Sequence, residues 1–158
     1  MPKLSRGRSP TGQRGFSELV QPAQDVLGTI EIDPALSAGL ADLAGFSHLL
    51  VLSHLHRGAP GGLVVVPFLD DTPRRIFATR SPRHPNPIGI SIVRLLGIDG
   101  SSLSIAGLDL LDGTPVLDIK PYVPAFDRWD AERIGWFEGR ADAVHRTRAD
   151  RRFDTDSR

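Results

Sequence analysis

Two Asp-Gly pairs, each between short apolar runs, constrain the fold of this 158-residue chain more than any other feature. Glycine adopts a positive φ at little cost, so an Asp-Gly pair between apolar runs favours a tight β-hairpin. The pairs and their flanking runs are Asp99-Gly100 between Ile90–Ile98 and Leu103–Leu108, and Asp112-Gly113 between Leu108–Leu111 and Val116–Ile119. We therefore predict two consecutive hairpins in the second half of the chain.

Four other apolar segments have the length of strands and are separated by turn residues. They are Thr29–Ile32, Phe46–His56, Leu63–Phe68 and Ile76–Thr79. Six or seven short strands with frequent turns are typical of a small barrel or sandwich. The pattern thus predicts a mainly β domain.

Helical signals are few. Asp33 is suited to cap a short helix over Ala35–Leu43, with Pro34 at its first position. The segment from Trp129 to about Arg152 also has a helical pattern, weakened by Gly135 and Gly139. We expect helices only at the periphery.

Composition excludes several classes of protein. No apolar run approaches the roughly 18 residues that a membrane helix needs, and no apolar stretch follows the basic N-terminus as in a secretory signal. There is no cysteine, which removes disulfides and thiolate chemistry and fits a reducing compartment. Nineteen basic residues balance nineteen acidic ones, so net charge gives no support for nucleic-acid binding.

The two ends of the chain are more basic than the rest. Residues 1–20 carry Lys3, Arg6, Arg8 and Arg14 against Glu18, and residues 139–158 carry six arginines against four aspartates. Such ends are either solvated tails or contacts for RNA phosphates. Both interpretations stay open.

The segment Phe77–Gly89 combines three prolines with polar side chains. Pro82, Pro85 and Pro87 restrict the backbone and hold a fixed surface. Arg80 and Arg83 carry planar guanidinium groups suited to a carboxylate or phosphate. The segment is either a ligand-binding loop or a rigid surface loop with solvated arginines.

The segment Asp109–Tyr122 carries a second polar constellation. The turn Asp112-Gly-Thr-Pro115 exposes backbone N–H groups, a hydroxyl and a carboxylate, which suit a ribose or an amino acid. An ordinary β-turn has the same spacing. Asp118 and Lys120 share a face of the following strand, as an ion pair or as part of a pocket wall.

Three histidines, His48, His54 and His56, would project to one face of a single strand. This spacing can bind zinc, iron or copper, but no neighbouring carboxylate completes a ligand set. No glycine-rich dinucleotide motif, P-loop or nucleophile-elbow serine is present, which argues against a Rossmann-type enzyme.

Taken together, these segments resemble the TsaA-like β-barrel family of tRNA methyltransferases, which modify threonylcarbamoyladenosine beside the anticodon. The resemblance extends over about residues 28–139. The matching stretches, in family order, are Gly45–Leu49, His56-Arg57, Pro67–Thr72, Phe77–Gly89, Asp109–Tyr122 and Ile134–Trp136. It implies a single-domain β-barrel over 28–140. Residues 1–27 mix Arg, Ser, Gly, Pro and Gln with little periodicity, which predicts an irregular arm, and residues 141–158 are predicted as a charged tail.

The resemblance also implies S-adenosylmethionine as cofactor, a homodimer, a tRNA anticodon loop as partner, and a cytoplasmic location without a membrane. Carried over position by position, the implied cofactor contacts are His56, Arg57, Arg80, Ile90, Asp112, Gly113, Thr114 and Pro115. The family's N-terminal Pro-x-Gln element corresponds best to Pro22-Ala23-Gln24, without its usual central arginine.

The reaction expected is in-line methyl transfer to the exocyclic nitrogen of the modified adenosine. That nitrogen is acylated and weakly nucleophilic, so a base would assist, and Asp118 and His84 are the candidate catalytic residues. Two alternatives remain open. One is a non-catalytic S-adenosylmethionine- or RNA-binding module on the same barrel, and the other is a histidine-ligated metalloenzyme.

Overall fold

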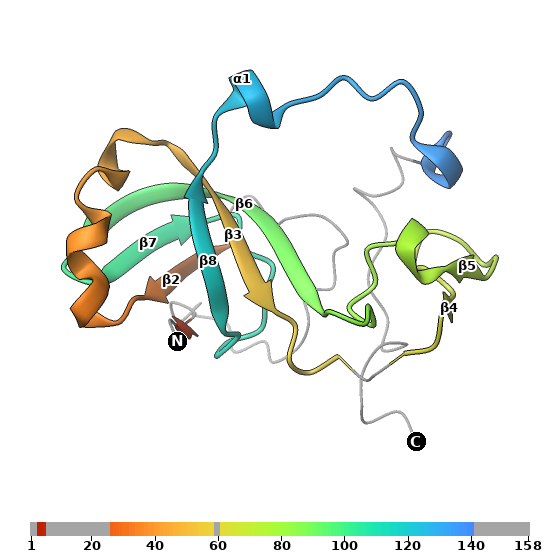
Figure 1. Cartoon of the computed structure of the whole chain (residues 1–158), viewed down its shortest axis with the longest axis horizontal. Helices are drawn as coiled ribbons and strands as arrows, with labels where there is room; N and C mark the ends of the chain where they lie inside the picture. Colours follow the sequence, from red (N-terminus) through yellow and green to blue (C-terminus); the bar gives the residue numbers. More distant parts are fainter. Residues whose placement is uncertain (1–2, 6–25, 59–60, 141–158) are drawn as a thin grey trace.

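The computed structural model describes residues 3–5, 26–58 and 61–140, which form a β-rich domain (Figure 1). Its strands are β1 (Lys3–Ser5), β2 (Leu27–Glu31), β3 (His48–His54), β4 (Val64–Val65), β5 (Arg74–Arg75), β6 (Ile88–Asp99), β7 (Ser102–Ala106) and β8 (Val116–Pro121). Its helices are one α-helical turn, α1 (Pro124–Asp127), and four short 3₁₀ segments, η1 (Pro34–Leu40), η2 (Leu43–Gly45), η3 (Ile76–Ala78) and η4 (Gly135–Phe137). The predicted mainly β class with short peripheral helices is confirmed.

Six strands form one antiparallel sheet in the order β1-β2-β7-β6-β3-β8. The long strand β6 pairs with β7 on one side and with β3 on the other. The predicted hairpin at Asp99-Gly100 is confirmed, because β6 and β7 pair through Asp99↔Ser102 and Gly100 has φ +56°. In Figure 1 β6 runs the length of the sheet, and β4, β5 and η3 lie beyond one end of it.

A closed barrel is not found among the described residues. Closure requires the two outer strands of a sheet to pair with each other. Here β1 pairs only with β2 and β8 only with β3, so the described sheet is open. Lys3–Ser5 forms β1 within the segment predicted as an irregular arm, whereas residues 6–25 and 141–158 lie outside the described residues.

One face of the sheet carries the hydrophobic core. The fully buried side chains from five of its strands and the following loop are Ile30, Leu49, Val51, Val93, Leu103, Ile105, Leu108 and Val116. Leu40 and Leu43 from η1 and η2 pack against this cluster. In β3 the burial alternates, with Leu49, Val51 and Ser53 buried, as expected for a strand with one face on a core.

The second predicted hairpin is wrong, although its turn is present. Gly113 has φ +75° and the Thr114 N–H donates to the Leu111 carbonyl, which confirms the turn at Asp112-Gly113. Residues 107–111 are not a strand, because Leu108 turns into the core instead of continuing a ladder. Strand β8 pairs with β3, which is far away in the sequence.

The helical predictions are confirmed only in part. Asp33 accepts a hydrogen bond from the Ala35 N–H (2.9 Å) as predicted, but it caps a 3₁₀ segment, η1. The predicted helix from Trp129 is wrong over the described residues, where only η4 is helical. Gly135 and Gly139 both adopt positive φ, a conformation that an α-helix does not contain.

Two predicted strands are shorter or absent. Leu63–Phe68 contributes only β4, which pairs with β5 in a separate two-stranded sheet. The predicted strand Ile76–Thr79 is wrong and contains η3 instead. The Thr79 hydroxyl donates to the Ile76 carbonyl (2.8 Å), a side-chain bond that closes a tight turn.

Replacement of Gly89 by alanine should lower the free energy of unfolding by about 1–3 kcal/mol, because overpacking in a filled core carries a cost of this size. A Cβ at this position would lie 2.6 Å from the Ser53 Oγ and 3.0 Å from the Leu55 Cδ2. Gly97→Ala on the same strand is the matched control, since its Cβ would meet nothing within 4 Å. Urea denaturation of both variants measures the difference, and equal stabilities would contradict this packing.

Candidate functional site

The segments predicted to bind a ligand meet at one end of the sheet. Strand β3 runs antiparallel to both β6 and β8, so its C-terminal end lies beside their N-terminal ends. The His54 N–H donates to the Pro115 carbonyl (2.9 Å), and the Leu55 N–H donates to the Pro87 carbonyl (2.7 Å). The last residue of β3 and the residue after it therefore hold the proline-rich loop and the Asp-Gly-Thr-Pro turn next to each other.

Arg80 projects from a tightly bonded part of the proline-rich loop. Its neighbours Thr79 and Ser81 are buried, whereas Arg80 is exposed. The Thr79 Oγ1 accepts from the Ser81 N–H (3.4 Å), and the Ser81 Oγ accepts from the Arg83 N–H (3.2 Å). The loop thus presents the Arg80 guanidinium to solvent from a backbone fixed on both sides.

His84, one of the two candidate bases, bonds within the same loop. Its Nε2 lies 3.0 Å from the Thr79 carbonyl oxygen, and its ring contacts the edge of Phe77 at 5.7 Å between centroids. A carbonyl only accepts hydrogen bonds, so Nε2 must carry the proton. Only Nδ1 is then left to accept a proton from a substrate.

The Asp112–Pro115 turn exposes some of its groups and buries others. Asp112 and Gly113 are exposed, with open space around the Gly113 Cα. Thr114 is buried, and its hydroxyl donates to the Leu111 carbonyl (2.6 Å). Asp112 and Gly113 are thus accessible from solvent, and the Thr114 hydroxyl hydrogen is bonded within the turn.

His56 and Arg57 lie directly after β3 and are exposed. The His54 and His56 rings are 6.3 Å apart, whereas His48 lies at the other end of β3 and bonds with Ser47. Within residues 26–58 and 61–140, no three histidine or carboxylate side chains are grouped as metal ligands. The metalloenzyme alternative gains no support from this arrangement.

Ile90 and Asp118 lie on the sheet face opposite the core. Both are Cα partners of Leu52, Ile90 on β6 and Asp118 on β8, so they flank it on one face. Ile90 is 69% exposed and lies between Ile88 and Ile92, each about half exposed. These three isoleucines form an apolar strip that leads from the site along β6.

Asp118, the other candidate base, forms an ion pair. Lys120 Nζ lies 2.7 Å from its Oδ2, and the Ile119 N–H donates to its Oδ1 (2.9 Å). Bonding to Lys120, together with the Ile119 N–H, lowers the pKa of the Asp118 carboxyl. The carboxylate is ionised at neutral pH but is a weaker base than an unpaired one.

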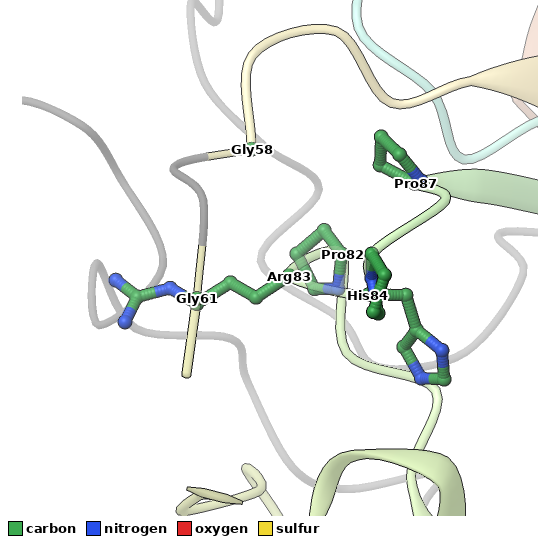
Figure 2. Close-up of a pocket in the computed structure, with 7 residues that line it drawn as sticks. Gly58, Gly61, Pro82, Arg83, His84 and Pro87 are labelled. Atoms are coloured by element: carbon green, nitrogen blue, oxygen red, sulfur yellow. The ribbon is translucent and has the colours of Figure 1, made fainter. Parts of the chain in front are cut away.

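A pocket of about 160 Å³ opens between the proline-rich loop and the loop after β3 (Figure 2). It is lined by Gly58, Gly61, Pro82, Arg83, His84, Pro85 and Pro87. Figure 2 shows Arg83 extending across Gly61 while His84 points to the other side of the loop. Sites for drug-sized ligands usually measure about 300–1,000 Å³, so this pocket is smaller than such a site.

The chain after α1 returns to this region and forms contacts that the sequence did not predict. The Trp136 indole N–H donates to the Ala78 carbonyl (2.6 Å), and the Arg74 guanidinium lies 5.5 Å from the Trp136 ring centroid. Asp70 forms an ion pair with Arg74, whose Nε donates to it at 2.9 Å, and Arg140 lies 3.6 Å away. Ala78 and Trp136 lie in stretches that carry the family resemblance, but no sequence pattern predicts their contact.

The predicted N-terminal contacts, Pro22, Ala23 and Gln24, lie outside the described residues. Within the part of the chain that the structure describes, no helix has both the length and the apolar character needed to cross a membrane.

Solved structures share this fold. Two crystal structures of TrmO from Pseudomonas aeruginosa match 85% of the chain with TM-scores of 0.67 and 0.68 and sequence identities of 35% and 36%. The match covers 58% and 59% of the crystallised chains. The domain is therefore a TrmO-like β fold with its polar loops at the C-terminal end of β3.

The sequence comparisons give the family. The profile described as "tRNA-methyltransferase O N-terminal domain" matches residues 15–128. A probable S-adenosyl-L-methionine-binding protein of Pyrococcus abyssi is 48% identical over 131 residues, 83% of this chain and 71% of that protein. The chain belongs to the tRNA-methyltransferase O N-terminal domain family.

The relatives differ in length. The tRNA (adenine(37)-N6)-methyltransferase of Mus musculus is 38% identical over 91 residues, which are 56% of this chain and 21% of the mouse protein. A probable S-adenosyl-L-methionine-binding protein of Archaeoglobus fulgidus is 50% identical over 109 residues, 69% of this chain and 30% of that protein. The chain thus spans less than a third of these two longer relatives.

Acidification should remove the stabilising contribution of Asp70. Hydrogen bonding to Arg74 lowers the pKa of Asp70 to about 2, whereas an unfolded aspartate titrates near about 3.9. The unfolded state binds the proton first, so this contribution is complete above about pH 5 and is lost as pH falls towards about 2. Urea denaturation between these pH values measures it.

Asp70→Asn is the reference variant for this titration. The difference in unfolding free energy between the natural chain and the variant should shrink as the pH falls. A difference that stays constant over this range would mean that Asp70 does not titrate as its contacts require.

Proposed function

We propose that this chain is a cytoplasmic S-adenosylmethionine-dependent methyltransferase that acts on tRNA. Family membership gives the class of reaction, and the names of the relatives give the cofactor and the acceptor. The observation that carries the proposal is the pair of hydrogen bonds at the C-terminal end of β3, from His54 to Pro115 and from Leu55 to Pro87. They hold the two loops with cofactor-type side chains against each other.

The residues at this end of the sheet fit the cofactor by their chemistry. Arg80 and Arg57 are exposed cations for its carboxylate, Asp112 is an acceptor for ribose hydroxyls, and the open space at Gly113 lets a ligand approach the backbone. His56 and Pro115 border the same region, and Pro22, Ala23 and Gln24 would complete it from the N-terminal segment.

In this proposal, a second copy of the chain completes the cofactor site. The pocket of about 160 Å³ is too small for the whole cofactor. The strip of Ile88, Ile90 and Ile92 leaves apolar side chains in water beside it. A homodimer that covers this strip would bury the isoleucines and add a second wall, with Ile90 contacting the cofactor at the interface.

When bound, S-adenosylmethionine supplies a methyl group on a positively charged sulfur. The sulfur is a good leaving group, because it becomes a neutral thioether when the methyl group is transferred. The task of the chain is then to orient cofactor and acceptor for in-line attack and to exclude water. The fixed Arg80 backbone and the Pro87 and Pro115 contacts serve this orientation. Arginines of the proline-rich loop would contact phosphates of the tRNA.

The acceptor in this proposal is the exocyclic nitrogen of threonylcarbamoyladenosine in the anticodon loop. Unstacked loop bases enter a pocket without opening a duplex. As the nitrogen takes the methyl group it loses a proton, and Asp118 and the Nδ1 of His84 are the candidate acceptors. The Lys120 ion pair makes Asp118 a weak base, so rearrangement of this pair would accompany proton transfer.

Purified protein should transfer labelled methyl from S-adenosylmethionine to tRNA that carries the threonylcarbamoyl group, because that group defines the proposed acceptor nitrogen. The same tRNA without the group is the control. Scintillation counting of the precipitated tRNA measures incorporation. Equal labelling of both tRNAs would refute the proposed substrate. Binding of the cofactor without any methyl transfer would favour the non-catalytic module.

Arg80→Ala should raise the dissociation constant for S-adenosylmethionine about tenfold or more, since a hydrogen bond to a charged group contributes roughly 1.5–3 kcal/mol. Isothermal titration calorimetry measures the constant. Arg128→Ala, which removes an exposed arginine from the segment after α1, is the matched control and should bind as the natural chain does. Unchanged affinity of the Arg80 variant would remove Arg80 from the site.

A further inference from the structure

The short helix η4 and the residues up to Arg140 contact the region directly before Arg80. Figure 1 shows η4 beside η3 and β5, although about sixty residues of chain separate them. The contact is specific, because the Trp136 indole N–H donates to the carbonyl of Ala78, the last residue of η3 (2.6 Å). Arg80 follows two residues later.

A network of charges fixes Trp136 in this position. Arg140 donates to the Trp136 carbonyl through Nη1 (2.9 Å), and its Nη2 lies 3.6 Å from the Asp70 Oδ1. Asp70, whose side chain is 5% exposed, pairs at its other oxygen with Arg74, and the Arg74 guanidinium lies over the Trp136 ring. Trp136 is thus held through its backbone and its ring, while its indole N–H points at Ala78.

The bond from Trp136 completes the restraint of the backbone around Arg80. The Ala78 carbonyl accepts from Trp136, the Thr79 carbonyl from His84, and the Ser81 N–H donates to the Thr79 hydroxyl. The Trp136 bond comes from outside the loop and its immediate neighbours. Without it, the peptide between η3 and Thr79 loses its link to the C-terminal segment.

We propose that Trp136 is a positioning residue for Arg80, and that the Asp70–Arg74–Arg140 network serves this contact. The inference rests on the proposed function, because it assigns to Arg80 the binding of S-adenosylmethionine. Trp136 is not among the residues proposed to contact cofactor or acceptor. Its indole N–H holds the backbone two residues before Arg80, which orders the loop that carries the guanidinium and lowers the entropy lost when the cofactor binds.

Trp136→Phe tests this proposal, because it keeps an aromatic ring under Arg74 and removes only the N–H. The variant should bind S-adenosylmethionine about three- to tenfold more weakly, the range expected for loss of one hydrogen bond. Its kcat at saturating cofactor should stay close to that of the natural chain. Trp129→Phe is the matched control, since the Trp129 N–H donates only to the nearby Phe126 carbonyl (3.2 Å).

A double-mutant cycle separates positioning from general stability. In the Arg80→Ala background, Trp136→Phe should not weaken cofactor binding further, because the side chain that it positions is gone. Additive losses in the double variant would overturn the proposal and leave Trp136 a structural residue. So would unchanged affinity of Trp136→Phe in the natural background.

Hydrogen–deuterium exchange gives a readout that needs no cofactor. Trp136→Phe should increase deuterium uptake in a peptide covering residues 76–87, and Trp129→Phe should not. Unchanged uptake after Trp136→Phe would overturn the proposal. Failure of the natural chain to bind S-adenosylmethionine would instead reject the proposed function, and the exchange result would still report whether Trp136 holds the loop.

Discussion

The pairing of β3 with both β6 and β8 is the constraint on which the rest of this structure depends. β3 lies between strands that come from later parts of the chain, and its alternating side chains supply Leu49 and Val51 to the core. Because both neighbours run antiparallel to it, the loops that precede them arrive at the same end. Backbone hydrogen bonding therefore continues at the C-terminal end of β3, where His54 and Leu55 donate to the carbonyls of Pro115 and Pro87.

This arrangement explains how a small sheet can present polar loops in a defined position. Each loop ends in a proline whose carbonyl accepts from β3, and proline restricts the backbone on its own side. The buried Thr114 and Ser81 turn their hydroxyl groups to backbone partners within the loops. Arg80 and Asp112 are among the side chains that these loops leave exposed, and their charges suit the ligand binding that we propose.

Local signals in the sequence predicted local structure. The hairpin at Asp99-Gly100 and the cap at Asp33 are confirmed, because glycine torsion and a short carboxylate act over two or three residues. The prediction of the second hairpin is wrong because core packing decides which strand pairs with β8. Leu108 packs in the core, and β8 pairs with β3. No nearest-neighbour pattern carries that information.

The same limit applies to the candidate site. The polar groups of both loops were visible as motifs, and the family resemblance supplied their roles as predictions. The proton on the His84 Nε2 and the ion pair of Asp118 depend on contacts that only the folded chain defines. The contact of Trp136 with Ala78 spans 58 positions. Indole and carbonyl groups are too common in a sequence to predict which of them meet.

Among the residues that the structure describes, β8 has an outer position, and this position has a consequence of another kind. A strand with one unpaired side offers its backbone to any other extended chain, and proteins commonly protect such strands with charge and proline. β8 carries Asp118 and Lys120 and ends at Pro121, which has no N–H to donate. Asp118, Lys120 and Pro121 are thus the kind of charge and proline that discourage backbone pairing of this edge with another extended chain.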